Sequence, residues 1–124
     1  MTSSARLRWL RIGGVAAIAL LVIASLSGLA AQPRTVLGWQ LEHFVGYFLA
    51  TLVVCSAWPR PLLVAAGIVV LAFLLEGLQA FTPDRTPNLS AALIGAGGTL
   101  VAILLAELFI RAQRRRTLES RESR

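Results

Sequence analysis

The sequence predicts an all-α fold, an integral membrane bundle of four transmembrane helices with short connecting loops. Hydrophobic residues make up 56% of the 124 positions and charged residues only 15%, whereas soluble domains carry about 25% charged residues. The apolar residues also gather into four long runs, which are separated by short segments rich in proline or charge. A water-soluble domain of this size could not bury so much apolar surface, so the membrane is the expected solvent.

The first helix is expected at about residues 12–31, after a basic N-terminus at residues 1–11 that carries Arg6, Arg8 and Arg11. This run holds about 20 apolar residues, which span about 30 Å as a helix. A cleavable signal peptide opens in the same way. The length of the run and the further segments behind it favour an uncleaved helix.

The second helix is expected at about residues 37–58, where Trp39 and Trp58 would lie at opposite ends, as in an aromatic belt. This version places Glu42 and His43 just inside the membrane boundary. A shorter helix that begins at Phe44 would span only about 22 Å, which is short for a bilayer.

The third helix is expected at about residues 62–81 and contains Glu76. The fourth is expected at about residues 89–110, with Asn88 as its N-cap. Together the four runs define one transmembrane domain over residues 12–110. Residues 111–124 form an arginine-rich tail, which is expected to be solvated and partly disordered.

Three small residues, Ala91, Gly95 and Thr99, lie four positions apart on one face of the fourth predicted helix. Such a face lets helices approach closely. Packing within the chain is the simpler interpretation, and the seam of a homodimer is the alternative.

The distribution of arginine predicts the orientation. Both ends of the chain are arginine-rich, and with four helices the connection with Arg60 lies on their side, whereas the other two connections carry one arginine each, Arg34 and Arg85. The positive-inside rule then places both termini in the cytoplasm. All basic residues are arginine, and Ala, Leu and Gly are abundant. This bias suggests a bacterium with a GC-rich genome, and hence a multi-pass protein of the bacterial cytoplasmic membrane.

Polar residues from distant parts of the chain converge at the outer end in this topology. A carboxylate at mid-bilayer costs about 2.5–3.5 kcal/mol on insertion scales, so Glu76 is the first candidate for function. Either Arg85 or His43 is its expected partner. Alternatively, a Glu76–Arg85 pair could only tie the third helix to its own loop. The candidate functional cluster consists of Glu42, His43, Tyr47, Glu76, Gln79 and Arg85.

Other site classes receive little support. The arginines lie at the ends of apolar runs rather than in a stripe, so nucleic-acid binding is not expected. Cys55 and His43 are the only residues of their types, so no metal site and no cofactor are expected, and catalytic residues are not identified. Glu107 stands four residues before Arg111, and an exposed ion pair explains it adequately.

The order of several short motifs resembles the VanZ-like family of small bacterial membrane proteins. The resemblance rests on Glu42-His43-Phe44 with Tyr47, on Glu76-x-x-Gln79 and on Pro83-x-Arg85, and it covers about residues 40–102. The Asp and Asn usual on the family's last helix fall on Ala91 and Gly95 here. The family's namesake is linked to resistance to teicoplanin, a lipid-bearing glycopeptide.

The resemblance implies a role at the outer face of the cytoplasmic membrane. The first hypothesis is a polar pocket of Glu76, Arg85 and His43 that engages an amphiphile or a lipid of the cell envelope. The second is an intramembrane enzyme with Glu76 and His43 as acid and base. The third is a small transporter or a subunit of a larger complex. Membrane lipids are expected partners in every case.

Overall fold

The computed structural model of the chain describes residues 3–28, 38–82 and 84–122. Within these ranges every regular element is a helix, in the order α1 (Ser3–Leu26), α2 (Trp39–Ala57), α3 (Pro61–Leu78), the short 3₁₀ helix η2 (Gln79–Phe81) and α4 (Leu89–Glu122). The predicted all-α class with four long helices is confirmed.

Each of the four long helices is apolar and long enough to cross a membrane, with α3 and η2 counted as one span over Pro61–Phe81. Large apolar side chains also cover the outside of the bundle, among them Leu62, Leu104 and Phe81, the last 86% exposed. In water such a surface would drive aggregation, whereas lipid tails solvate it. By length and composition the chain is a multi-pass membrane protein.

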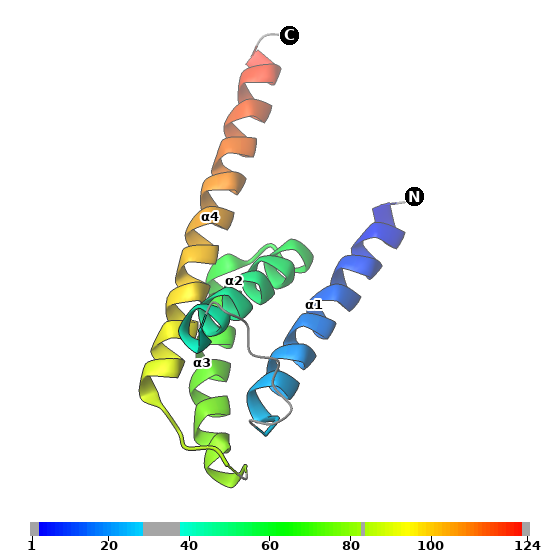
Figure 1. Cartoon of the computed structure of the whole chain (residues 1–124). Coiled ribbons are helices and arrows are strands. Elements are labelled where there is room, and N and C mark those ends of the chain that lie inside the picture. Colours follow the sequence, from blue (N-terminus) through cyan, green and yellow to red (C-terminus); the bar gives the residue numbers. More distant parts are fainter. Residues whose placement is uncertain (1–2, 29–37, 83, 123–124) are drawn as a thin grey trace.

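Successive helices run in opposite directions, so the N- and C-termini lie at the same end of the molecule (Figure 1). Helix α2 packs against both α1 and α4, and α3 packs mainly against α4. The opposite end brings together the end of α1, the start of α2, the η2 turn and the start of α4. The candidate functional residues lie at that end.

The helix boundaries differ from the expected ones at two places. Helix α1 already begins at Ser3 and ends at Leu26, so the basic N-terminus is helical and the predicted end at residue 31 lies outside the described residues. Helix α4 continues without a break to Glu122, so the expectation of a partly disordered tail is wrong. Arginine, glutamate, glutamine and leucine all have high helix propensity, and they extend the span into the polar segment.

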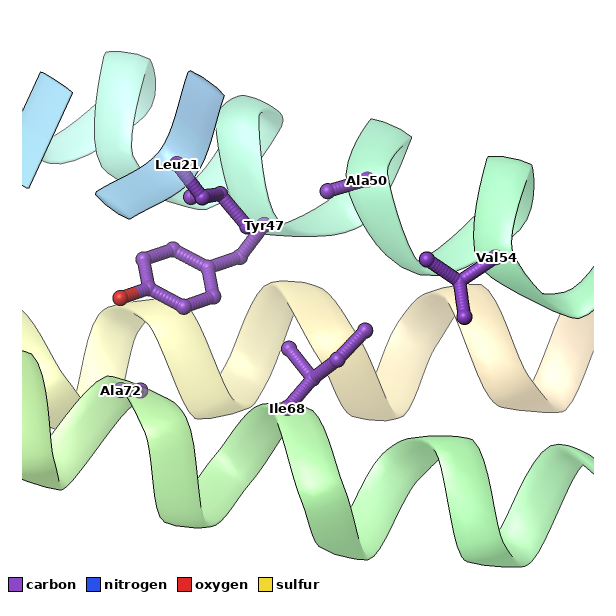
Figure 2. Packing of buried hydrophobic residues seen from close by; sticks show 6 residues of the cluster. All are labelled: Leu21, Tyr47, Ala50, Val54, Ile68 and Ala72. Carbon is purple, nitrogen blue, oxygen red and sulfur yellow. The ribbon is translucent and has the colours of Figure 1, made fainter. Parts of the chain in front are cut away.

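The core is small and lies where α1, α2 and α3 meet. Its buried residues are Leu21, Tyr47, Ala50, Val54, Ile68 and Ala72. Figure 2 shows Tyr47 projecting from α2 toward the α4 ribbon, with Ile68 and Ala72 on α3 on the opposite side of the cluster. Ala50 and Ala72 are small and allow the helices to approach closely at these positions.

The closest approach in the bundle is between α2 and α4, and glycine makes it possible. A Cβ atom at Gly98 would overlap the backbone carbonyl oxygen of Phe44 and lie 3.3 Å from the backbone nitrogen of Phe48. Beside it, the Thr51 hydroxyl, which donates to the Tyr47 carbonyl oxygen at 2.7 Å, lies 3.3 Å from the Thr99 hydroxyl across the same interface. Both threonines are fully buried.

This contact uses the small-residue face of α4. Ala91 is 5% exposed and Thr99 is 0% exposed, and a Cβ atom at Gly95 would lie 2.9 Å from the Tyr47 ring. The packing interpretation is therefore confirmed. The homodimer stays a prediction, and within the single chain Gly95 and Thr99 of this face contact α2.

Replacing Gly98 with alanine is expected to weaken the bundle by about 1–3 kcal/mol, because the added methyl group meets backbone atoms that cannot rotate away. Gly97→Ala is the matched control, since a Cβ atom there would only touch the Phe44 ring at 4.0 Å. Unfolding of the purified protein by increasing amounts of sodium dodecyl sulfate in mixed micelles measures both variants. Equal stability of the two would contradict this account of the α2–α4 contact.

Candidate functional site

The six candidate residues gather at the end of the bundle opposite the termini. Tyr47, Glu76 and Gln79 are buried, whereas Glu42, His43 and Arg85 are half-buried. Helix α2 supplies Glu42, His43 and Tyr47. Glu76 lies near the end of α3, Gln79 begins η2, and Arg85 lies in the connection to α4. The predicted convergence is present.

Glu76 binds the beginning of α4. Its Oε1 accepts a hydrogen bond from the backbone N–H of Asn88 at 3.0 Å, and its Oε2 lies 3.5 Å from the Gln79 side-chain nitrogen. Asn88 is in turn the N-cap of α4, since its Oδ1 accepts the backbone N–H of Ser90 at 3.0 Å. A carboxylate beside a helix N-terminus interacts favourably with the helix dipole. The buried charge of Glu76 thus has a structural explanation.

Arg85 binds the end of α1. Its Nε and Nη2 atoms donate to the backbone carbonyl oxygen of Ser27 at 3.2 and 3.0 Å. Ser27 directly follows the last helical residue, where carbonyl groups lack partners and a cation is favourable. A tight turn directs the arginine there, because the Arg85 N–H donates to the Thr82 carbonyl oxygen at 3.3 Å. Asp84 adopts a positive φ of 62° within this turn, which aspartate tolerates better than most residues.

Tyr47 joins α1, α2 and α4. Its ring lies against Gly95 of α4, and its side chain forms a hydrogen bond with that of Ser25 in α1. His43, one turn earlier, packs on the Tyr47 ring with the centroids 5.5 Å apart and the planes tilted by 40°. Any residue larger than glycine at position 95 would displace the ring, and with it the imidazole.

His43 lies within electrostatic range of both Glu76 and Arg85, so the three ionisable groups of the predicted pocket do lie near one another. Glu42 is the acidic residue of the first turn of α2, a position that the helix dipole favours.

Of the two expected partners of Glu76, His43 lies within electrostatic range of it, whereas the prediction of Arg85 is wrong. Among the described residues the ion pair is Glu107–Arg111 at 3.3 Å, as expected for that exposed pair, and Glu76 forms none with Arg85. Each charge instead binds the backbone at a helix end. An orphan N–H at a helix N-terminus is a fixed and nearby donor, whereas the long arginine side chain reaches a different helix.

Several polar residues of this region were missed by sequence reasoning. Ser25 and Ser27 bind Tyr47 and Arg85, and Thr51 contacts Thr99, the last residue of the small-residue face. Their only signal in the sequence is that they are hydroxyl-bearing residues within or beside apolar runs. Such residues often bond their own helix backbone, as Thr51 does to the Tyr47 carbonyl oxygen at 2.7 Å, so the signal is weak.

Every buried side-chain nitrogen or oxygen in the described part of the chain has a hydrogen-bond partner. The cluster therefore costs little to keep in an apolar medium, and it ties α1, α2, α3 and α4 together at one end. Within the cluster, Glu76 is buried and bound through both oxygens, whereas His43 and Arg85 are partly open to the surroundings.

Comparison of the chain with family models, with curated proteins and with solved structures finds no match.

Replacement of Glu76 by alanine is expected to destabilise the bundle by about 1–3 kcal/mol, because the Asn88 N–H loses its acceptor in an apolar region. Glu76→Gln keeps one acceptor oxygen, so its loss should be smaller. Unfolding in mixed detergent micelles gives the free energies.

Glu107→Ala is the control for that series. It removes a carboxylate from an exposed pair whose arginine is 74% exposed, and such pairs contribute about 0–1 kcal/mol. If Glu76→Ala were no more destabilising than Glu107→Ala, the structural role of Glu76 would be refuted.

Proposed function

We propose that this chain is a VanZ-like protein of the bacterial cytoplasmic membrane that binds the anionic headgroup of an amphiphile. Arg85 is the anchoring group at the end of the bundle opposite the termini. In this proposal that end faces outward and both termini are cytoplasmic, in agreement with the positive-inside rule. The ligand class is a lipid of the cell envelope or a lipid-bearing antibiotic such as teicoplanin.

The observation that carries the proposal is the position of Arg85. Its guanidinium is half-buried at the end of an apolar bundle, and it forms no ion pair within the described ranges. The Ser27 carbonyl oxygen accepts from two of its nitrogens, whereas a guanidinium carries five N–H donors. A phosphate or carboxylate would bind the remaining donors and neutralise the charge, and such charge-assisted bonds are the strong ones.

Position within the membrane also favours an amphiphile. The span Pro61–Phe81 ends four residues before Arg85, so the guanidinium lies near the depth at which lipid headgroups meet the apolar core. Leu78 and Phe81, both exposed, lie shortly before Arg85 in the chain. A ligand with an apolar chain and a charged head would contact both kinds of surface.

The geometry favours binding over acid–base catalysis by Glu76. Both of its oxygens face donors that belong to the fold, Asn88 and Gln79, and His43 packs on Tyr47. An acid–base pair needs groups that reach a substrate proton. Arg85 is better placed for a ligand than Glu76, and it is the residue to test first.

Arg85→Gln is expected to weaken binding of a long-chain polyprenyl monophosphate by about tenfold or more, since bonds to charged groups contribute about 1.5–3 kcal/mol. The uncharged polyprenol of the same length should bind wild type and variant equally weakly. Native mass spectrometry of the detergent-solubilised protein measures all four combinations.

Gln113→Ala is the control, because Gln113 is an exposed neutral residue at the other end of the bundle. Arg85→Lys should retain part of the affinity, and unfolding midpoints identify any variant that fails through instability. Equal binding of the phosphate and the polyprenol by a folded wild type would show that Arg85 is not an anion site.

In a teicoplanin-sensitive Gram-positive host, expression of the wild type is expected to raise resistance to teicoplanin several-fold. Resistance to vancomycin, which lacks the lipid tail, should not change. Arg85→Gln should lose the protection, and Gln113→Ala at matched membrane levels should keep it. The antibiotic concentrations that stop growth provide the measurement. Absence of protection from a well-expressed wild type would separate this chain from teicoplanin resistance and leave the lipid ligand to be tested directly.

A further inference from the structure

A second charged region lies at the end of the bundle that bears both termini. Eight exposed arginines gather there, from the first turns of α1, from the α2–α3 connection and from the polar part of α4. They are Arg6, Arg8, Arg11, Arg60, Arg111, Arg114, Arg115 and Arg116, and we name them the arginine collar. Figure 1 shows that the polar part of α4 and the beginning of α1 extend toward the same end.

The collar is poor in counter-charges. Glu107 binds Arg111 at 3.3 Å, and no other collar arginine has a carboxylate in ion-pair contact within residues 3–28, 38–82 and 84–120. The region therefore presents a large excess of positive charge. An anionic partner is the chemistry that complements it, and a second copy of the chain would bring like charges together.

The arrangement of the arginines around the helices distinguishes a membrane surface from a protein partner. Consecutive residues of an α-helix are about 100° apart, so Arg114, Arg115 and Arg116 project to three different sides of α4. On α1, Arg8 and Arg11 are three residues apart and share one face, whereas Arg6 lies on the other side of the helix. A protein docks against one face of a helix, whereas a layer of lipid headgroups surrounds a spanning helix on all sides.

The depth of the collar agrees with a headgroup layer. Leu108 and Phe109 are exposed and apolar, and the first collar residue of α4, Arg111, follows two positions later. Arg114 to Arg116 then lie about 5–8 Å further along the helix axis. That distance is within the Debye length of about 8–10 Å, over which anionic lipids attract basic residues. Trp9, which is 64% exposed, adds an interfacial aromatic side chain at the same level of α1.

We propose that the arginine collar binds anionic phospholipid headgroups of the surrounding leaflet. The protein then carries a shell enriched in phosphatidylglycerol-type lipids around the end that bears both termini. This shell is separate from the ligand site at Arg85, because the two regions lie at opposite ends of the bundle. It also fixes the depth of α1 and α4 in the membrane.

The test uses the full chain in nanodiscs of equal parts phosphatidylglycerol and phosphatidylcholine. Native mass spectrometry counts the lipids of each class that remain bound after the nanodisc is disrupted. The wild type is expected to retain phosphatidylglycerol in several-fold excess. Replacement of Arg114, Arg115 and Arg116 together by glutamine should remove most of that excess, whereas their replacement by lysine should preserve it.

Gln113→Ala, which changes an exposed neutral residue beside the same cluster of α4, is measured in parallel and should leave the phosphatidylglycerol excess unchanged. These arginines are fully solvent-facing in the bundle, and circular dichroism checks that the triple variants remain helical. Equal retention of the two lipids by the wild type would overturn the proposal. So would an undiminished excess in the glutamine variant, and an acidic protein would then be the partner to seek.

Discussion

The close contact between α2 and α4 is the constraint on which the remaining structure depends. In lipid no hydrophobic force drives helices together, so association relies on close packing and hydrogen bonds. Gly98 lets the α4 backbone reach the backbone at Phe44, and the buried hydroxyls of Thr51 and Thr99 lie 3.3 Å apart across the interface. The same contact seats the Tyr47 ring over Gly95. Tyr47 in turn contacts Ser25 of α1 and His43 of α2. The α2–α4 contact at the glycines therefore positions residues of the polar end.

At that polar end the negative side chain binds a helix N-terminus and the positive side chain binds a helix C-terminus. Glu76 accepts the backbone N–H of Asn88 at the start of α4, and Arg85 donates to the carbonyl oxygen of Ser27 after the end of α1. The two ionic side chains thus neutralise helix dipoles rather than each other. A direct pair would have left both helix ends without these partners in an apolar medium. The arrangement explains the buried carboxylate without a ligand, and it leaves the partly open guanidinium as the group suited to an external anion.

The spans, the Asn88 cap, the Glu107–Arg111 pair and the convergence of polar residues could all be predicted, because each depends on local spacing and on antiparallel order. The sequence could not predict the group that binds Glu76. Pairing of opposite charges suggested Arg85 or His43, whereas the backbone N–H of Asn88 donates to the carboxylate. The sequence also could not predict which face of each helix points into the bundle. Nearly all residues of these spans are apolar, so no apolar stripe distinguishes the inner face from the outer one. Ser25 and Thr51 were missed for that reason. The segment from Arg111 to Glu122 was expected to be partly disordered because it is polar, although its residues have high helix propensity and it is helical in the structure.

Helix α4 runs from its Asn88 cap to Glu122 as one element of 34 residues, which corresponds to about 51 Å. No proline interrupts it, so the membrane span and the polar segment form one continuous helix. A change of about 10° in its tilt would move the far end sideways by about 9 Å, by the same helix geometry. Because the cap is bonded to Glu76, small rearrangements at one membrane face would be transmitted mechanically, and enlarged, to the other face.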